Sequence, residues 1–246
     1  MNAVFIYNTL GQDYFSFKQF TIQQKKCSLK VSTDSCILGA WFANKTLGAE
    51  NILDIGSGTG LLMLMMAQKT TGTITGIEIE SSCFEQLEEN ILNSPWKQRC
   101  SIVAGDVRNY LFNNTFDFIV SNPPFYEGQL ESEVQIKNMA KHSSHLTLSE
   151  LFNVVNRILS PGGKFGVLLP FSRKVSAIGI AKTFSLHCTE VVDIRQTPVH
   201  DFFRTILQFE RQSVPVVSHN DLTIKESTGD YSSRFHLLLE DYYLFL

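Results

Sequence analysis

The sequence has few of the features that mark membrane proteins, secreted proteins or strongly basic nucleic-acid-binding proteins. Its longest uninterrupted apolar run, Leu61 to Ala67, is far shorter than the roughly 20 residues that a membrane-spanning helix needs. The N-terminus lacks the basic stretch followed by an apolar core that marks a signal peptide, so we expect a cytoplasmic protein without membrane contact. A formal net charge of −3 also means that any contact with a nucleic acid must come from local basic patches.

Cysteine is scarce and irregularly spaced. The cysteines of the chain are Cys27, Cys36, Cys83, Cys100 and Cys188. Their number is odd, no CxxC pair occurs, and the wide spacings match no zinc module. We therefore expect reduced, mostly buried thiols and no metal site.

Short apolar runs alternate with helical stretches from residue 51 onward. The runs that we expect to be strands are 51–55, 73–79, 100–104, 116–120 and 164–169. Such alternation predicts an α/β fold with a doubly wound, mostly parallel sheet and helices on both faces. Two β-like segments near the end, 186–195 and 204–211, have no helix-length insert between them and predict an antiparallel pair at the sheet edge.

The length of 246 residues suits one domain, with an N-terminal extension over 1–50 and a core over 51–246. Apolar and polar residues alternate in 14–31, which predicts a short β-rich, hairpin-like segment in this extension. Asp34 is expected to cap the helix that follows it. The tail, 231–246, is expected to form a helix that docks through an apolar face.

A glycine-rich run, Asp54 to Gly60, follows the first strand of the core and precedes a helix. Its glycines (Gly56, Gly58 and Gly60) permit positive φ and close approach of a ligand to the backbone. Dinucleotide-binding folds also use such a loop, but the spacing here is G-x-G-x-G and not the G-x-G-x-x-G that fits a pyrophosphate. Asp54 would repel a pyrophosphate and suits the ammonium group of a methionine moiety. The loop therefore predicts a site for S-adenosylmethionine, with S-adenosylhomocysteine as the product; a plain structural turn is the alternative.

Two further acids follow strands of the same predicted sheet. Glu78 ends the second strand, about 20 residues beyond the loop, where an acid can accept hydrogen bonds from both hydroxyls of a ribose. Asp106 follows the third strand, with Val107 beside it, at a place suited to the adenine amino group of the cofactor. The alternatives are a solvated carboxylate for Glu78 and a helix cap over 107–111 for Asp106.

The tetrapeptide Asn122-Pro123-Pro124-Phe125 follows the fourth strand. Its two prolines stiffen the turn and remove backbone donors. What remains is the carboxamide oxygen of Asn122, the carbonyl of Pro123 and the ring of Phe125. These groups suit a planar amine, with two acceptors for its two N–H groups and a ring for stacking. Orientation of the amine would then drive methyl transfer without a strong general base; an ordinary proline turn is the alternative.

The loop and the tetrapeptide together resemble class I methyltransferases of the amino-methylating NPP[FYW] group, which methylate adenine N6, guanine N2, cytosine N4 or a glutamine amide. Further segments resemble the bacterial tRNA1(Val) (adenine-N6)-methyltransferase family in particular. These segments are 17–22, 30–34, 38–41 and the tail with Tyr242-Tyr243-Leu244. The resemblance covers nearly the whole chain.

This resemblance implies a Rossmann-like catalytic core with a seven-stranded sheet and an antiparallel last strand pair. It implies methyl transfer to N6 of the adenine just 3′ of the anticodon, position 37, of tRNA1(Val). Carried onto this sequence, 122–125 would form the amine site, and Thr33 would join the cofactor-binding residues. The implied partner is the anticodon stem-loop of a tRNA, and no obligate protein partner is expected.

Basic and aromatic residues offer candidate contacts for the RNA. The basic ones gather in three places, namely Lys18, Lys25, Lys26 and Lys30; Lys137, Lys141, His142 and His145; and Arg173 with Lys174. Such groups can meet phosphates, although surface lysines are common in any protein. Phe125 and Tyr126 would accept an unstacked base of the anticodon loop. Arg204 is expected to form a structural ion pair instead of a substrate contact.

Other functions stay open from the sequence. A protein glutamine N5-methyltransferase is one, because a glutamine amide fits the same two acceptors. Those enzymes usually carry a helical N-terminal domain, whereas this chain opens with β-like alternation. A guanine-N2 rRNA methyltransferase is another alternative, and a non-catalytic RNA-binding module that keeps the fold is a third.

Overall fold

A computed structural model describes residues 13–124 and 146–246 of the chain. In chain order its elements are β1 (Tyr14–Ser16), β2 (Thr21–Gln23), α1 (Thr33–Ala43), η1 (Asn44–Thr46), β3 (Asn51–Ile55), α2 (Leu61–Ala67), β4 (Thr73–Glu78), α3 (Ser81–Leu92), η2 (Lys97–Arg99), β5 (Cys100–Ala104), β6 (Phe116–Ser121), α5 (Leu148–Ile158), β7 (Leu159–Pro170), η3 (Phe171–Arg173), α6 (Lys174–Thr183), β8 (His187–Arg195), β9 (Phe202–Glu210), β10 (Ser218–Thr223) and α7 (Ser233–Leu239).

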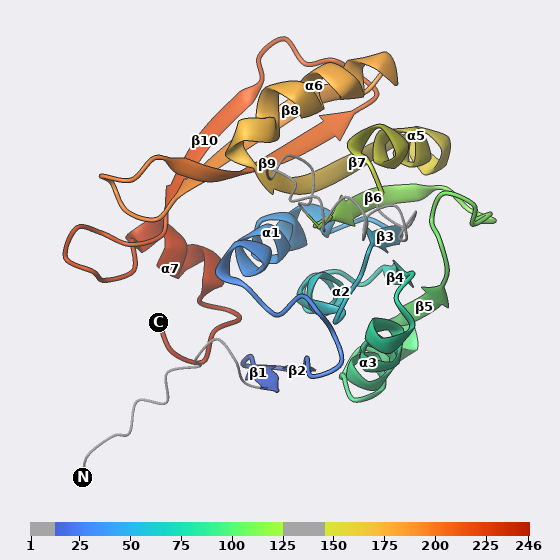
Figure 1. The fold of residues 1–246 in the computed structure, drawn as a ribbon, viewed down its shortest axis with the longest axis horizontal. Coiled ribbons are helices and arrows are strands. Elements are labelled where there is room, and N and C mark those ends of the chain that lie inside the picture. Colours follow the sequence, from blue (N-terminus) through green and yellow to red (C-terminus); the bar gives the residue numbers. More distant parts are fainter. Residues whose placement is uncertain (1–12, 125–145) are drawn as a thin grey trace, which may run out of the picture.

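The centre of the described part is a sheet of eight strands in the order β10-β8-β9-β7-β6-β3-β4-β5 (Figure 1). Neighbouring strands are parallel except at β9, which runs antiparallel to both β7 and β8. This confirms the predicted mostly parallel sheet with an antiparallel last pair.

The expected count of seven strands was wrong, because β10 adds to the edge beside β8. β10 buries one side chain, Leu222, and leaves the others exposed or half-buried. An edge strand of this kind shows little of the apolar alternation by which a strand is recognised in a sequence.

Helices cover both faces of the sheet. α1, α2, α3 and α7 pack on one face, and α5 and α6 pack on the other (Figure 1). Successive side chains of each strand point to opposite faces, so that Ile52 and Phe118 enter the first core and Leu53 and Ile119 enter the second. This arrangement confirms the doubly wound α/β fold.

The N-terminal extension forms the predicted hairpin, in which β1 and β2 pair antiparallel. The hairpin lies beside the C-terminal tail, where Phe17 bridges Tyr243 and the Lys18 N–H donates to the Tyr242 carbonyl at 2.8 Å (Figure 1). The tail docks as expected, with Phe235 and Tyr242 buried, but its helix is limited to Ser233–Leu239.

Asp34 is not the cap of α1, as the sequence had suggested. Ser32 has the extended backbone of an N-cap, and its hydroxyl pairs reciprocally with Ser35 in a capping box. Asp34 lies in the first turn and accepts a hydrogen bond from Nε of Arg204 at 2.7 Å. Arg204 thus makes the structural ion pair expected of it.

The expectation that the cysteines are reduced was wrong for two of them, because Cys27 and Cys83 form a disulfide. The extension packs against α3 and brings together these two residues, which are 56 positions apart. Spacing alone does not reveal such a pair. Cys36 is a buried thiol, and Cys100 and Cys188 are half-buried thiols.

Residues 13–124 and 146–246 show neither a metal-binding cluster nor a membrane-spanning helix. No group of three or more His, Cys, Asp or Glu side chains is arranged to bind a metal ion there. No helix in these ranges is both long and apolar enough to cross a membrane.

Candidate cofactor and amine site

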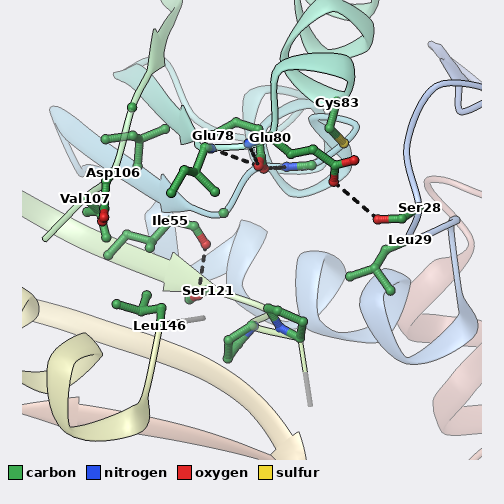
Figure 2. A pocket seen from close by; sticks show the side chains of 17 residues that line it. Ser28, Leu29, Ile55, Glu78, Glu80, Cys83, Asp106, Val107, Ser121 and Leu146 are labelled. Carbon is green, nitrogen blue, oxygen red and sulfur yellow. Dashed lines mark hydrogen bonds between the residues drawn. The ribbon is translucent and has the colours of Figure 1, made fainter. Parts of the chain in front are cut away.

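A cavity of about 490 Å³ opens at the edge of the sheet where the parallel strands β3, β4, β5 and β6 end (Figure 2). Its size is that of a pocket for a small organic ligand. The lining residues that the sequence had singled out are Gly56, Gly58, Glu78, Asp106, Val107, Pro123 and Pro124. Residues from four different strand ends thus meet here, because the carboxyl ends of parallel strands lie at one edge.

The glycine loop has the backbone conformation that its sequence predicts. Gly56, Gly58 and Gly60 have φ of 71°, 54° and 82°, in the region that side chains disfavour. A Cβ at Gly60 would also lie 2.7 Å from Cδ1 of Leu87 in α3. The loop therefore presents bare backbone to the cavity at Gly56 and Gly58 and packs closely on α3 at Gly60.

Glu78 fixes this loop to the end of β4. One carboxylate oxygen accepts the N–H of Gly58 at 2.8 Å, and the other accepts the N–H groups of Ile79 and Glu80 at 2.9 Å (Figure 2). The side chain is buried yet lines the cavity, so its direction is set before any ligand arrives. Carboxylate oxygens have further lone pairs, which can accept hydroxyl groups.

Asp54, at the end of β3 before the loop, is fully buried, and neither of its carboxylate oxygens has a hydrogen-bond partner among the described residues. Burial raises the pKa of this carboxyl from 3.8 to about 8, and the nearby charge of Glu78 adds to the rise. A buried carboxylate without a partner is costly unless a cation meets it. Asp54 does not itself line the cavity, although Ile55 and Gly56 beside it do.

Asp106 lines the cavity and forms an ion pair with Arg108, a residue that the sequence had not singled out. Nε of Arg108 lies 2.9 Å from both carboxylate oxygens of Asp106, and a terminal nitrogen lies 2.6 Å from one of them. These hydrogen bonds hold the pKa of Asp106 below its usual range. Arg108 also reaches Glu150, the third residue of α5 and a member of its capping box with Thr147, at 3.3 Å. Asp106 also accepts the backbone N–H of Arg108 at 3.0 Å. The residue therefore caps the turn that follows it and lines the cavity at the same time.

The proline corner after β6 stands beside the glycine loop. Ser121 donates to the carbonyl of Ile55 at 2.9 Å and thereby joins the ends of β6 and β3 (Figure 2). Pro123 and Pro124 line the cavity. The side-chain oxygen of Asn122 is buried and has no hydrogen-bond partner within the described residues. Asn122 itself is not among the lining residues, whereas Ser121 and Pro123 on either side of it are.

Other predicted residues lie elsewhere or outside the described ranges. Thr33 is exposed at the start of α1, and Lys30 is exposed with its ammonium group against the backbone carbonyls of Gln24 and Lys25; neither lines the cavity. Phe125, Tyr126, Lys141 and His142 lie outside the described residues, as do Lys137 and His145.

Part of the cavity wall comes from residues that the sequence analysis missed. Ser28 and Leu29 of the extension, Glu80, Cys83 of α3 and Leu146 all line it. Ser28 donates to Glu80 at 3.3 Å across this side of the cavity (Figure 2). Glu80 could have been inferred from its place two residues after Glu78. The others depend on how the extension and α5 pack, which no local pattern in the sequence shows.

The fold and the site together define an S-adenosylmethionine-dependent methyltransferase. The methyltransferase small domain model matches residues 30–185. Among solved structures, a predicted O-methyltransferase, protein Atu636 of Agrobacterium tumefaciens, superposes with a TM-score of 0.60 at 15% identity, over 84% of this chain and 95% of that one. A putative class I S-adenosylmethionine-dependent methyltransferase of Listeria monocytogenes also gives 0.60, at 14% identity over 81% and 67% of the two chains. These structures share the fold.

Curated relatives are much closer in sequence. The tRNA1(Val) (adenine(37)-N6)-methyltransferase of Phocaeicola vulgatus is 37% identical over 231 residues, 94% of this chain and 97% of the relative. The protein of the same name from Dyadobacter fermentans is 38% identical over 241 residues, with the same coverage. The chain belongs to the methyltransferase small domain family and to the family of the tRNA1(Val) (adenine(37)-N6)-methyltransferases. The resemblance seen in its motifs is thereby confirmed.

Proposed function

We propose that this protein transfers a methyl group from S-adenosylmethionine to N6 of adenine 37 in tRNA1(Val), the reaction for which its relatives are named. The observation that carries the proposal is the buried side-chain oxygen of Asn122 at the proline corner, which has no hydrogen-bond partner among the described residues. Together with the carbonyl of Pro123, it offers two acceptors to the two N–H groups of an exocyclic amine. Leaving a buried acceptor unpaired is unfavourable, and an N–H group of a bound amine would satisfy this one.

Four sets of groups would hold the cofactor in the cavity. Asp54 would pair with the ammonium of its methionine part, and Glu78 would accept the ribose hydroxyls. Asp106 would accept the adenine amino group, with Val107 packing beside it, and the glycine loop would contact the cofactor through its backbone. When bound, S-adenosylmethionine supplies a methyl group activated by a positively charged sulfur.

The chemistry of the chain's own residues would be orientation and not proton abstraction. The described lining of the cavity contains no histidine or lysine that could act as a base. Asn122 and Pro123 would fix both amine protons and so direct the nitrogen lone pair away from them. Holding two reactants in this way can lower the barrier substantially, and the amine proton can leave after the transfer.

The proposed partner is the anticodon stem-loop of the tRNA, which places the reaction in the cytoplasm. Phe125, Tyr126, Lys141 and His142 remain predicted contacts for the RNA. The described N-terminal segment is a β hairpin and not the helical domain expected of a protein glutamine methyltransferase. This difference favours an RNA substrate.

The substrate can be tested by supplying labelled S-adenosylmethionine together with separate pools of unmodified tRNA, rRNA and protein. We expect label in tRNA only, and mass spectrometry of the digested tRNA should find N6-methyladenine at position 37 of tRNA1(Val). Label on a protein glutamine or on guanine N2 would contradict the proposal.

Asn122→Ala tests the amine site. The variant should lose methyl transfer by about 10²–10³-fold, the usual effect of removing one preorganised hydrogen-bonding group from an active site. Its affinity for S-adenosylmethionine, measured by calorimetry, should stay near that of the wild type. Asn114→Ala, an exposed asparagine in the loop before β6, is the matched control and should retain full activity. Near-normal turnover of Asn122→Ala would refute this role.

A further inference from the structure

The carboxyl edge of the sheet has two halves of different chemistry. Over β6, β3, β4 and β5 lies the cavity, whose lining includes the carboxylates Glu78, Glu80 and Asp106. Over β7, β9 and β8 the edge carries rings and cations instead. We call this second half the aromatic–cationic edge; it consists of Phe171, Lys174, Arg195, Phe202, Phe203 and Arg204.

The strand register places this edge beside the proline corner. Ser121, the last residue of β6, lies opposite Val167 of β7, so β7 continues three residues further, to Pro170. Pro170 in turn pairs with Arg204 of β9. Neighbouring strands lie about 4.8 Å apart, so the start of β9 is about 10 Å from the line of β6. The aromatic–cationic edge is therefore within reach of the nucleotides next to a base bound at Asn122.

Rings and cations alternate along this edge. Phe171 and Phe202 pack with ring centroids 5.5 Å apart. Nζ of Lys174 lies 4.2 Å from the ring centroid of Phe171, and Cζ of Arg195 lies 5.3 Å from that of Phe202. Further along, Arg204 lies 5.5 Å from the ring of Phe203, which is 37% exposed. Such an alternation suits bases, which stack on rings and guanidinium planes.

Two of these cations form ion pairs with acids whose side chains are less exposed than the cations themselves. The Lys174 side chain is 21% exposed and its partner Asp193 15%, with 2.7 Å between the charged atoms. Arg204 is 28% exposed and its partner Asp34 14%, also at 2.7 Å. The acids therefore fix the cations in place from below, while the cations lie nearer to the solvent. Arg195 differs, because its partner Asp221 is the more exposed.

We propose that the aromatic–cationic edge binds the RNA nucleotides that flank the target adenine; this inference rests on the proposed function. Single-stranded nucleotides are bound by stacking on aromatic side chains, with cations at their phosphates. The carboxylates of the cavity repel phosphates, so the RNA leaves the proline corner over β7, β9 and β8.

The rival surface is the lysine-rich N-terminal segment. There Lys25 pairs with Asp13 at 3.6 Å and Lys26 with Glu85 at 3.2 Å, and in each pair the acid is well exposed. An exposed acid beside each of these two lysines offsets its attraction for a phosphate, whereas Lys18 and Lys30 donate to backbone carbonyls. In this segment Phe17 and Phe20 are buried against each other and cannot receive a base, whereas Tyr14 is 47% exposed.

Phe203→Ala and Lys174→Gln test the inference by steady-state kinetics with unmodified tRNA. Phe203→Ala should raise KM for tRNA about tenfold, as loss of one base–aromatic stack does. Lys174→Gln should reduce the slope of log affinity for tRNA against log salt by about one, the effect of losing one phosphate contact. Both should keep the wild-type affinity for S-adenosylmethionine and the wild-type kcat at saturating tRNA.

Lys182→Gln is the matched control, because Lys182 is an exposed lysine at the other end of the same helix, α6. It should leave both KM and the salt slope unchanged. If Phe203→Ala lowers the melting temperature, its KM no longer tests the inference by itself. The slope of log affinity for tRNA against log salt, measured for Lys174→Gln, then decides whether the inference holds. The inference is overturned if both test variants match Lys182→Gln while the wild type methylates tRNA. A wild type that methylates no RNA refutes the proposed function itself.

Discussion

Asp54 and Asn122 share one property, a buried side-chain oxygen that no described residue satisfies. Such groups lower stability, because burial removes water and no donor replaces it. Asp106 differs from both, because its carboxylate accepts three short hydrogen bonds from Arg108. The described chain thus supplies donors to Asp106 but none to these oxygens of Asp54 and Asn122.

The raised pKa of Asp54 predicts how cofactor affinity depends on pH. In the free protein the carboxyl is protonated up to about pH 8, whereas the ammonium group of the cofactor needs it ionised. Binding must therefore release a proton, and affinity should rise by up to about tenfold per pH unit between pH 5.5 and 7.5. Calorimetry across this range measures it. Asp54→Asn should bind weakly at every pH; a wild-type affinity that does not change would contradict the assignment.

The raised pKa of Asp54 also makes the free energy of unfolding of the free protein depend on pH. The folded free protein binds a proton at Asp54 between about pH 4 and 8, and the unfolded chain does not. The contribution of Asp54 therefore lowers the free energy of unfolding as the pH rises through that window. In the proposed site, a bound cofactor would remove this contribution by pairing with the carboxylate.

At the scale of elements, the N-terminal extension is part of the cavity wall and is fastened to α3. Asn90 of α3 exchanges two hydrogen bonds of 2.8 Å with the backbone of Gln23, and its amide also donates to the carbonyl of Thr59 in the glycine loop. The Cys27–Cys83 disulfide ties the same two elements together. The position of Ser28 and Leu29 at the cavity therefore depends on this contact between elements.

Reduction of the disulfide should destabilise the protein. Opening a cross-link between residues 56 positions apart restores chain entropy to the unfolded state, worth up to about 4 kcal/mol in the loop-closure model. We expect a lower melting temperature for the wild type in reductant. The Cys27→Ser/Cys83→Ser double variant should melt at one temperature with or without reductant. Titration of five thiols in the unreduced, unfolded wild type would contradict the disulfide.

At the scale of the whole molecule, one edge of the sheet carries the described groups of the proposed reaction. The parallel strands β3, β4, β5 and β6 end at the cavity, and the reversed strand β9 begins at the aromatic–cationic edge. In the proposed reaction, the relation between cofactor and substrate would thus be set by the sheet and not by the loops alone.

Cofactor binding should stabilise the whole fold, because it completes a site built from four strand ends. At about 100 times the dissociation constant, a ligand adds about 2.7 kcal/mol to the free energy of unfolding. For a chain of this length that is a rise of about 5–10 °C in melting temperature. A thermal shift assay with S-adenosylmethionine measures it. Asn122→Ala should show the full rise and Asp54→Asn little of it; equal rises would show that Asp54 does not contact the cofactor.

Much of the site could be predicted from sequence because its residues follow strands directly. Gly56, Glu78, Asp106 and Asn122 each stand just after a strand or at its end, and parallel strands bring their carboxyl ends together. The ion pair of Arg108 with Asp106 was not predicted, because the sequence does not distinguish a solvent-exposed arginine from one that binds a carboxylate. β10 was missed because an exposed edge strand has little apolar pattern to recognise.

The sequence by itself determined the alternation of strands and helices, the conformation of the glycine loop and the stiff proline corner, because each depends on neighbouring residues only. The tertiary structure alone decided the partners that are distant in the chain. Cys27 meets Cys83 across 56 positions, and Arg204 meets Asp34 across 170. Such pairs form only when packed elements bring their side chains together, and packing depends on the whole set of buried surfaces rather than on any local run of residues.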